Sequence, residues 1–184
     1  MNINGLIGSL QSGVAQGVLW GIMVLGVYIT YKLLDIADLT VDGSFTLGGC
    51  VTTVAILAGI HPVPATLMGM GAGFLAGAVT GILHTFFNIP AILAGILTQI
   101  GLWSINLRIM GGKANNPLLK ADTVVSFFAD NFSLSNSMAS MAVGILLVIL
   151  VILILYWFFG TEIGSALRAT GDNEDMIRAL GVNT

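Results

Sequence analysis

The sequence predicts an all-α protein that crosses a lipid bilayer about five times. Hydrophobic residues make up 56% of its 184 positions and charged residues only 8%, and the mean hydropathy is +0.97. Soluble globular domains carry about a quarter charged residues, so too few polar side chains remain here to cover a surface in water. With a net charge of −3 and few basic residues, the chain offers no surface typical of nucleic-acid binding.

Five apolar segments are long enough to cross a bilayer, since a helical span takes roughly 17–25 residues. The second is short and rich in glycine and threonine, so we expect it to be broken or only partly membrane-deep. Pro64 and Pro90 stand near helix starts, where the missing N–H costs little, and they predict tight hairpin turns. The predicted spans are residues 14–34, 44–60, 64–87, 90–109 and 137–159.

Glycine spacing indicates how these helices pack. Every fourth residue is glycine along one face of the first and third spans, and such faces let helix backbones approach closely in lipid. A tightly packed bundle is the favoured interpretation, and a permeation path along the same face is the alternative. The packing candidates in the third span are Gly69, Gly73, Gly77 and Gly81.

Patterns typical of catalysis are weak. Residues 111–114, Gly-Gly-Lys-Ala, lack the earlier glycine and the following Ser or Thr of a nucleotide-binding loop. His61 and His84 have no His or Cys neighbours at metal-ligand spacing. Cys50 is the single cysteine, which excludes an internal disulfide. We therefore expect no catalytic residue, metal or cofactor on this chain.

Three carboxylates, of Asp35, Asp38 and Asp42, follow the first span at spacings that would share one helix face if the segment were helical. Acidic residues at membrane depth often mark ion or substrate paths, whereas at an interface they are simply hydrated, which is the favoured interpretation. Residues 43–49 could form an unwound or closely packed element near a cavity. The candidates for a translocation path are Asp38, Asp42, Ser44 and Thr46.

The last 25 residues, 160–184, are polar and helical in pattern, unlike the rest of the chain. Gly171 is the predicted end of a first short helix. Asp172 is the predicted N-cap of a second, with Asp175 three residues later, and Gly181 closes it.

The second short helix carries a small apolar stripe of Met176, Ile177 and Leu180. A helix this short cannot span a membrane, so it either lies on lipid headgroups or fits a groove in another protein. The net-acidic surface disfavours anionic lipid, and the groove is therefore preferred.

At these residues the sequence resembles the permease subunits of bacterial ATP-binding-cassette (ABC) importers, in the branch of the branched-chain amino acid and ribose permeases. The resemblance covers nearly the whole chain and rests on residues 38–49, 77–83, 164–173 and 178–183. The tail lacks the literal Glu-Ala-Ala of the older permease signature. The first motif is most similar to a subgroup associated with amino-acid-like substrates, aromatic ones included.

The resemblance implies one transmembrane permease domain over residues 1–184, with a cytoplasmic coupling segment at 161–184 that sits in a cleft of the ATPase subunit. It implies a multi-pass protein of the bacterial inner membrane whose ATP is bound by a separate ATPase. The implied partners are that ATPase, a second permease subunit and an extracytoplasmic binding protein. An identical second subunit is the favoured interpretation, and a different one is the alternative. The residues implied to contact the ATPase or to organise the loop are Arg168, Asn173, Met176, Ile177, Arg178 and Leu180.

Family members continue past the coupling loop into further membrane helices, so the resemblance also predicts that residues 1–184 are the N-terminal part of a larger permease. Basic residues do not determine the orientation, because they divide equally between the two sides: Arg108, Lys113 and Lys120 against Lys32, Arg168 and Arg178. The resemblance places the tail in the cytoplasm and residues 110–136 outside.

Two other function classes are the alternatives to an ABC permease. An ion-coupled secondary transporter or channel would use Asp35, Asp38 and Asp42, and its transport would follow an ion gradient without an ATPase. A membrane-embedded enzyme lacks a credible acid–base, nucleophile or metal set.

Overall fold

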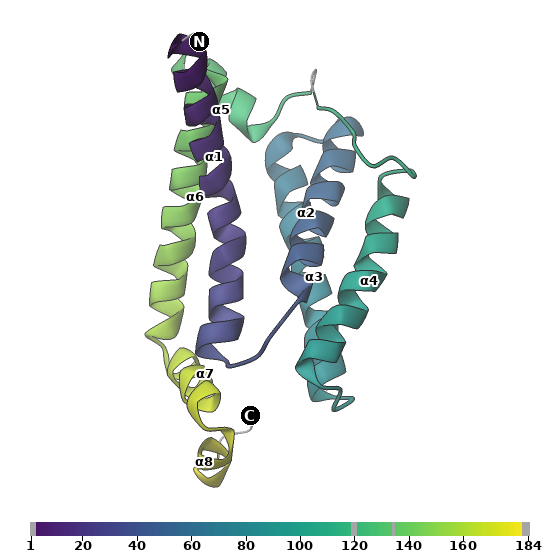
Figure 1. Ribbon diagram of the computed structural model, residues 1–184, viewed down its shortest axis with the longest axis vertical. Helices are drawn as coiled ribbons and strands as arrows, with labels where there is room; N and C mark the ends of the chain where they lie inside the picture. The colour runs from purple at the N-terminus through teal and green to yellow at the C-terminus, as the bar shows by residue number, and fades with distance from the viewer. Residues whose placement is uncertain (1–2, 119–120, 134, 182–184) are drawn as a thin grey trace. The chain divides into compact units, whose positions relative to one another are not determined.

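The structure, a computed structural model, describes residues 3–118, 121–133 and 135–181 (Figure 1). Lys120 and the last three positions of the predicted coupling segment lie outside the described residues. Within the described ranges every regular element is a helix, which confirms the predicted all-α fold. The elements are α1 (Ile3–Tyr28), the π-helix η1 (Ile29–Leu33), α2 (Thr40–Leu57), α3 (Pro62–Thr85), α4 (Ala91–Ile109), α5 (Val124–Phe132), α6 (Asn136–Phe159), α7 (Glu162–Asp172) and α8 (Glu174–Ala179).

Among the described residues, five helices are long and apolar enough to cross a membrane, and they match the five predicted spans. The second of them, α2, is a single unbroken helix of 18 residues, so the expectation of a broken span was wrong. Glycine lowers helix propensity because it adds backbone freedom to the unfolded chain. In α2 this cost is offset where Gly43 and Gly48 allow neighbouring helices to approach closely.

The chain divides into two compact units, Met1–Ile36 with Phe128–Thr184, and Ala37–Phe127. The first unit holds α1, η1, α6, α7 and α8. Its two long helices, α1 and α6, run parallel and side by side (Figure 1). The hydroxyl oxygens of Ser12 and Ser137 lie 3.1 Å apart near their starts, and a Cβ atom on Gly144 would lie 3.2 Å from Cγ1 of Val18.

The second unit packs α2 against both α3 and α4. Helix α3 runs antiparallel to α2, and the backbones meet where a Cβ atom on Gly48 would lie 3.1 Å from the carbonyl oxygen of Gly69. Helix α4 runs parallel to α2, and a Cβ atom on Gly95 would lie 2.9 Å from the backbone nitrogen of Leu39. Small residues therefore set both contacts.

The glycine row of α3 meets α2 along only part of its length. Gly69 packs on Thr52 and Gly48, and a Cβ atom on Gly73 would lie 3.4 Å from the Ser44 carbonyl oxygen. For Gly77 and Gly81, no atom of the described residues lies within 4 Å of an added Cβ atom. The second half of the row is thus a narrow, smooth helix surface left open by the described part of the chain.

Candidate functional site

The acidic residues between the first two spans do not share a helix face. Asp35 has a left-handed backbone with a φ of 53°, residues 35–39 are not helical, and Asp42 lies in the first turn of α2. A common face requires a continuous helix through all three carboxylates, and the backbone at Asp35 interrupts it. The three acidic residues therefore lie on backbone of different conformation, and their carboxylates do not form one row.

Asp38 fixes the start of α2. Its Oδ1 atom accepts a hydrogen bond from the backbone N–H of Thr40 at 2.8 Å, which satisfies one of the N–H groups that a helix start leaves unpaired. Asp42 follows in the first turn, where a negative charge is favoured by the helix dipole.

The other two path candidates turn their hydroxyl groups back onto α2. Ser44 donates to the Val41 carbonyl oxygen at 3.1 Å, and Thr46 donates to the Asp42 carbonyl oxygen at 2.9 Å. Ser44 is half-buried, whereas Asp42 and Thr46 are exposed and one turn apart. Of the four candidates, Asp42 and Thr46 thus share an open face of α2.

A buried polar seam, formed by Thr40, Thr80, Thr98 and Asn106, runs through the second unit. The hydroxyl oxygens of Thr40 and Thr80 lie 3.0 Å apart and join α2 to α3. Thr98 donates to the Ala94 carbonyl oxygen of its own helix at 3.0 Å. Sequence reasoning missed this seam, and its only signal was hydroxyl and amide residues within otherwise apolar spans.

Asn106 links α4 to α2 and keeps one polar atom unpaired. Its Nδ2 atom donates to the Gly43 carbonyl oxygen at 3.4 Å, and the residue is only 9% exposed. Its buried Oδ1 atom has no hydrogen-bond partner among the described residues. An unpaired buried acceptor costs about 1–3 kcal/mol. The contact between α2 and α4 therefore contributes less to stability than the burial of Asn106 alone would indicate.

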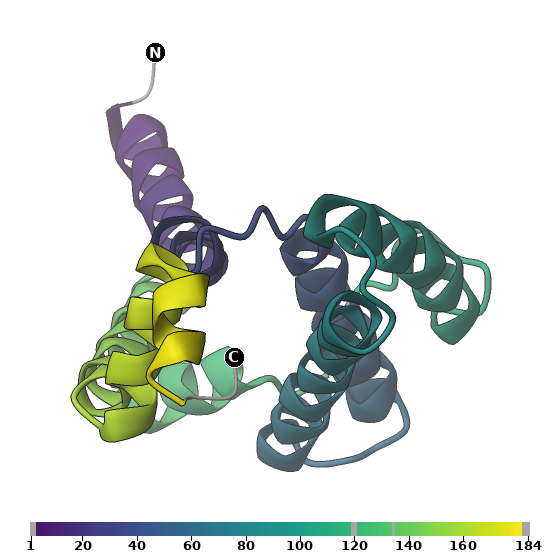
Figure 2. The ribbon, with the colours of Figure 1, turned by 90° about the horizontal axis from the view of Figure 1, so that it is seen from below.

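Helix α7, in the predicted coupling segment, is fastened to the end of α6. Thr161 caps α7 by accepting from the Gly164 N–H at 3.3 Å, and Arg168 donates from Nη2 to the Phe159 carbonyl oxygen at 2.9 Å. Figure 2 shows α7 and α8 across the ends of α1 and α6. Arg168 therefore organises the turn between α6 and α7.

The predicted helix end at Gly171 was wrong. Helix α7 continues through Gly171 to Asp172, because the missing side chain lets the Leu33 carbonyl oxygen of η1 lie directly against it. Since α7 is longer than predicted, the cap of α8 also shifts by one residue. Asn173, and not Asp172, caps α8 by accepting from the Met176 N–H at 3.0 Å.

The predicted end of α8 at Gly181 is confirmed, because Gly181 follows the helix with a left-handed φ of 86°. Within α8, Arg178 pairs with Glu174 at 2.6 Å. The apolar stripe is divided between two faces, since Ile177 is 6% exposed whereas Met176 and Leu180 are 55% and 71% exposed. One apolar side chain thus holds α8 in place and two remain open.

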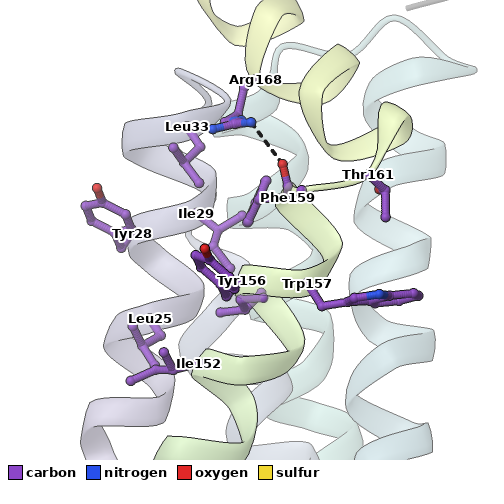
Figure 3. Close-up of a pocket in the computed structure, with 12 residues that line it drawn as sticks. Leu25, Tyr28, Ile29, Leu33, Ile152, Tyr156, Trp157, Phe159, Thr161 and Arg168 are labelled. Carbon is purple, nitrogen blue, oxygen red and sulfur yellow. Dashed lines mark hydrogen bonds between the residues drawn. The ribbon is translucent and has the colours of Figure 1, made fainter.

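A groove of about 750 Å³ lies beside the α6–α7 turn, between the ends of α1 and α6 (Figure 3). Its walls are apolar, and Arg168 lies at one end, uppermost in Figure 3. Among the residues that the structure describes, no three His, Cys, Asp or Glu side chains gather as metal ligands would. Ile29 and Leu33 of η1 and Phe159 of α6 are among its wall residues.

Glycine-packed helices of membrane length that lead into a capped, partly exposed amphipathic helix are typical of a multi-pass membrane protein with a surface for a soluble partner. The comparisons with known proteins agree with this class. The chain belongs to the family described as the permease component of branched-chain amino acid transport systems, whose family model matches residues 9–184.

Among curated relatives, a tyrosine transport system permease protein of Clostridioides difficile (strain R20291) is 41% identical over 172 residues, covering 94% of this chain and 55% of the relative. An uncharacterized protein of Rickettsia prowazekii is 31% identical, covering 94% of this chain and 58% of the relative. An autoinducer 2 import system permease protein of Yersinia pseudotuberculosis is 37% identical over 147 residues, covering 77% and 39%. The chain spans about half the length of the curated relatives it matches, and no solved structure matches it significantly.

Proposed function

We propose that this chain forms part of the translocation pathway of an ATP-driven importer in the bacterial inner membrane. The solute is an amino acid or a related small molecule, delivered by an extracytoplasmic binding protein. Membership of the permease family supports the transport role, and the printed name of the tyrosine transport relative supports an amino-acid substrate. ATP is bound and hydrolysed by a partner ATPase, and a second copy of the permease completes the pathway.

The observation that carries the proposal is the exposed apolar pair on α8. Met176 and Leu180 are four residues apart on one helix face and open to contact. Ile177 is buried and Asn173 caps the helix, so the pair is presented on an ordered element. Full burial of an exposed side chain of this size contributes about 1.5–3 kcal/mol, and Met176 and Leu180 are already partly buried, so a groove on the ATPase would gain less than this from each.

A capped helix also suits the transmission of force. Because α8 is already a capped helix with Ile177 buried, docking would cost less conformational entropy than the ordering of a free loop. Closure of the ATPase subunits would then displace α7 and α8 together and switch access to the pathway. On the membrane side, we propose that Asp42 and Thr46 line the pathway, since they share an open face of α2.

The docking claim is tested in the full-length permease, expressed with its ATPase and binding protein. Met176→Asp with Leu180→Asp places two charges on the docking face, and we expect at least tenfold less ATPase to co-purify. The matched control, Met176→Leu with Leu180→Met, keeps the face apolar and retains the ATPase. Unchanged co-purification and unchanged uptake by the Asp variant would overturn the docking claim.

Substrate uptake into proteoliposomes separates this function from ion-coupled transport. We expect uptake of an aromatic amino acid to require ATP together with the binding protein. Uptake that follows an ion gradient, needs no nucleotide and is lost on Asp42→Asn would contradict the proposal.

A further inference from the structure

Three residues fasten one face of α7 to the backbone of other elements. Gly164, Arg168 and Gly171 are spaced by four and three residues, so they share a helix face. Gly164 lies against the carbonyl group of Phe158, and Arg168 donates to the carbonyl oxygen of Phe159 at 2.9 Å. These two contacts join α7 to the end of α6.

The third contact joins α7 to a different helix. A Cβ atom on Gly171 would overlap the Leu33 carbonyl oxygen, and it would lie 2.9 Å from the Leu33 carbonyl carbon and 3.0 Å from the Leu34 Cα atom. All three atoms belong to backbone, which cannot rotate away as a flexible side chain can. Glycine is thus the only residue type that position 171 of α7 accepts without moving α7 or the end of η1.

The helix end that Gly171 meets is itself unusual. Residues Ile29–Leu33 form a π-helix, with the Leu34 N–H bonded to the Ile29 carbonyl oxygen at 3.2 Å. Asp35, just beyond it, has a left-handed φ of 53°. Single π-helical turns are rare and often occur at functional sites, and the wide turn with a left-handed exit gives the chain a defined place to bend.

Space for such a movement lies beside the contact. Ile29 and Leu33 line one wall of the groove of Figure 3, and Phe159 and Arg168 lie on the other side. Because this groove separates the ends of α1 and α6, η1 can shift relative to α6 without overlapping packed side chains. Gly171 bridges the two sides through α7.

We propose that Gly171 and Leu33 form a joint that carries displacement of the coupling segment into α1. Gly171 is then a positioning residue of the transport cycle, and this role rests on the proposed function. A force applied to α8 reaches α6 through Gly164 and Arg168, and it reaches α1 through Gly171. Without the Gly171 contact, α7 would pull on α6 alone.

The test follows both ends of the joint in the full-length permease, assembled with its ATPase and binding protein in proteoliposomes. Cys50 is first replaced by Ala. An environment-sensitive fluorophore is then placed on Lys32→Cys in η1 or on Ala179→Cys in α8, two exposed positions. We expect both labels to respond to ATP with the same nucleotide dependence. A response in α8 with none in η1 overturns the joint while leaving the docking function intact.

Gly171→Ala then tests the glycine itself. We expect this variant to keep its ATPase and the α8 response, to lose the η1 response, and to take up substrate at least tenfold more slowly. Gly21→Ala is the matched control on α1, since no atom of the described residues lies within 4 Å of its added Cβ atom, and its uptake should stay within twofold. Normal uptake and a normal η1 response in Gly171→Ala would also overturn the proposal.

If Gly171→Ala does not assemble, the labels in the otherwise unchanged protein still decide the matter. Loss of both label responses, together with no ATPase in the purified complex, would instead contradict the proposed function.

Discussion

The hydroxyl oxygens of Thr40 and Thr80 lie 3.0 Å apart, although 40 residues separate them in the sequence. Thr40 is 1% exposed and Thr80 is 7% exposed. The pair therefore joins the first turn of α2 to the C-terminal part of α3 within an apolar interior. An interhelical hydrogen bond of this kind gives each helix one preferred register against the other.

Replacing either threonine with valine should weaken this contact. Interhelical side-chain bonds in membrane proteins contribute about 0.6 kcal/mol on average and up to about 1.7 kcal/mol. We expect Thr40→Val and Thr80→Val to show a coupling free energy in this range in a double-mutant cycle, measured by denaturant unfolding of the detergent-purified protein.

Thr85→Val is the control for that cycle, because Thr85 is exposed and its hydroxyl donates only to the Gly81 carbonyl oxygen of its own helix. It should show no coupling to Thr40→Val. Strictly additive effects of Thr40→Val and Thr80→Val would mean that the observed pair contributes nothing to stability.

Alanine substitution should have opposite effects on stability at two glycines of the α3 row. Gly69→Ala places a methyl group against Thr52 and the Gly48 carbonyl group, so we expect a loss of roughly 1–3 kcal/mol in the free energy of unfolding. Gly77→Ala adds a methyl group where the described residues leave open space and should be neutral or stabilising by up to about 1 kcal/mol. Equal losses in the two variants would show that Gly77 meets a surface beyond the described contacts.

Asn106 should tolerate an apolar replacement better than a carboxylate. Asn106→Leu removes both the long bond to Gly43 and the unpaired Oδ1 atom, so its stability should stay within about 1 kcal/mol of the original. Asn106→Asp removes the donor and buries a second acceptor, which should cost roughly 1–3 kcal/mol. Thermal unfolding in detergent compares the two, and a less stable Leu variant would contradict this account of the unpaired atom.

Asn173 and Asp172 offer a sharp comparison at the start of α8. Asn173→Ala removes the bond to the Met176 N–H and should cost about 1 kcal/mol of local stability, whereas Asp172→Ala leaves that bond in place. Hydrogen exchange at the Met176 amide should accelerate several-fold in the Asn173 variant only. Faster exchange in the Asp172 variant would instead support Asp172 as the N-cap of α8, which the sequence predicted.

Much of the fold follows from local sequence patterns. Apolar segment length predicted all five membrane-length helices, and Gly181 marked the end of α8, because hydropathy and a left-handed glycine act within a few residues. The geometry of the candidate site was harder to predict from the sequence. Asp35 interrupts the helix that would have aligned the three carboxylates, and an acidic residue in a left-handed conformation leaves no distinctive pattern in the sequence.

The sequence by itself determined that the chain crosses a membrane several times and that a short amphipathic helix follows the fifth span. Only the tertiary structure decided that Gly171 lies inside α7 against Leu33, that Ile177 points inward while Leu180 stays open, and that Gly69 rather than Gly77 meets α2. The physical reason is that helix formation depends on neighbours along the chain. The face that a helix covers depends on backbone from distant residues, and a glycine looks the same in the sequence whether or not another helix lies against it.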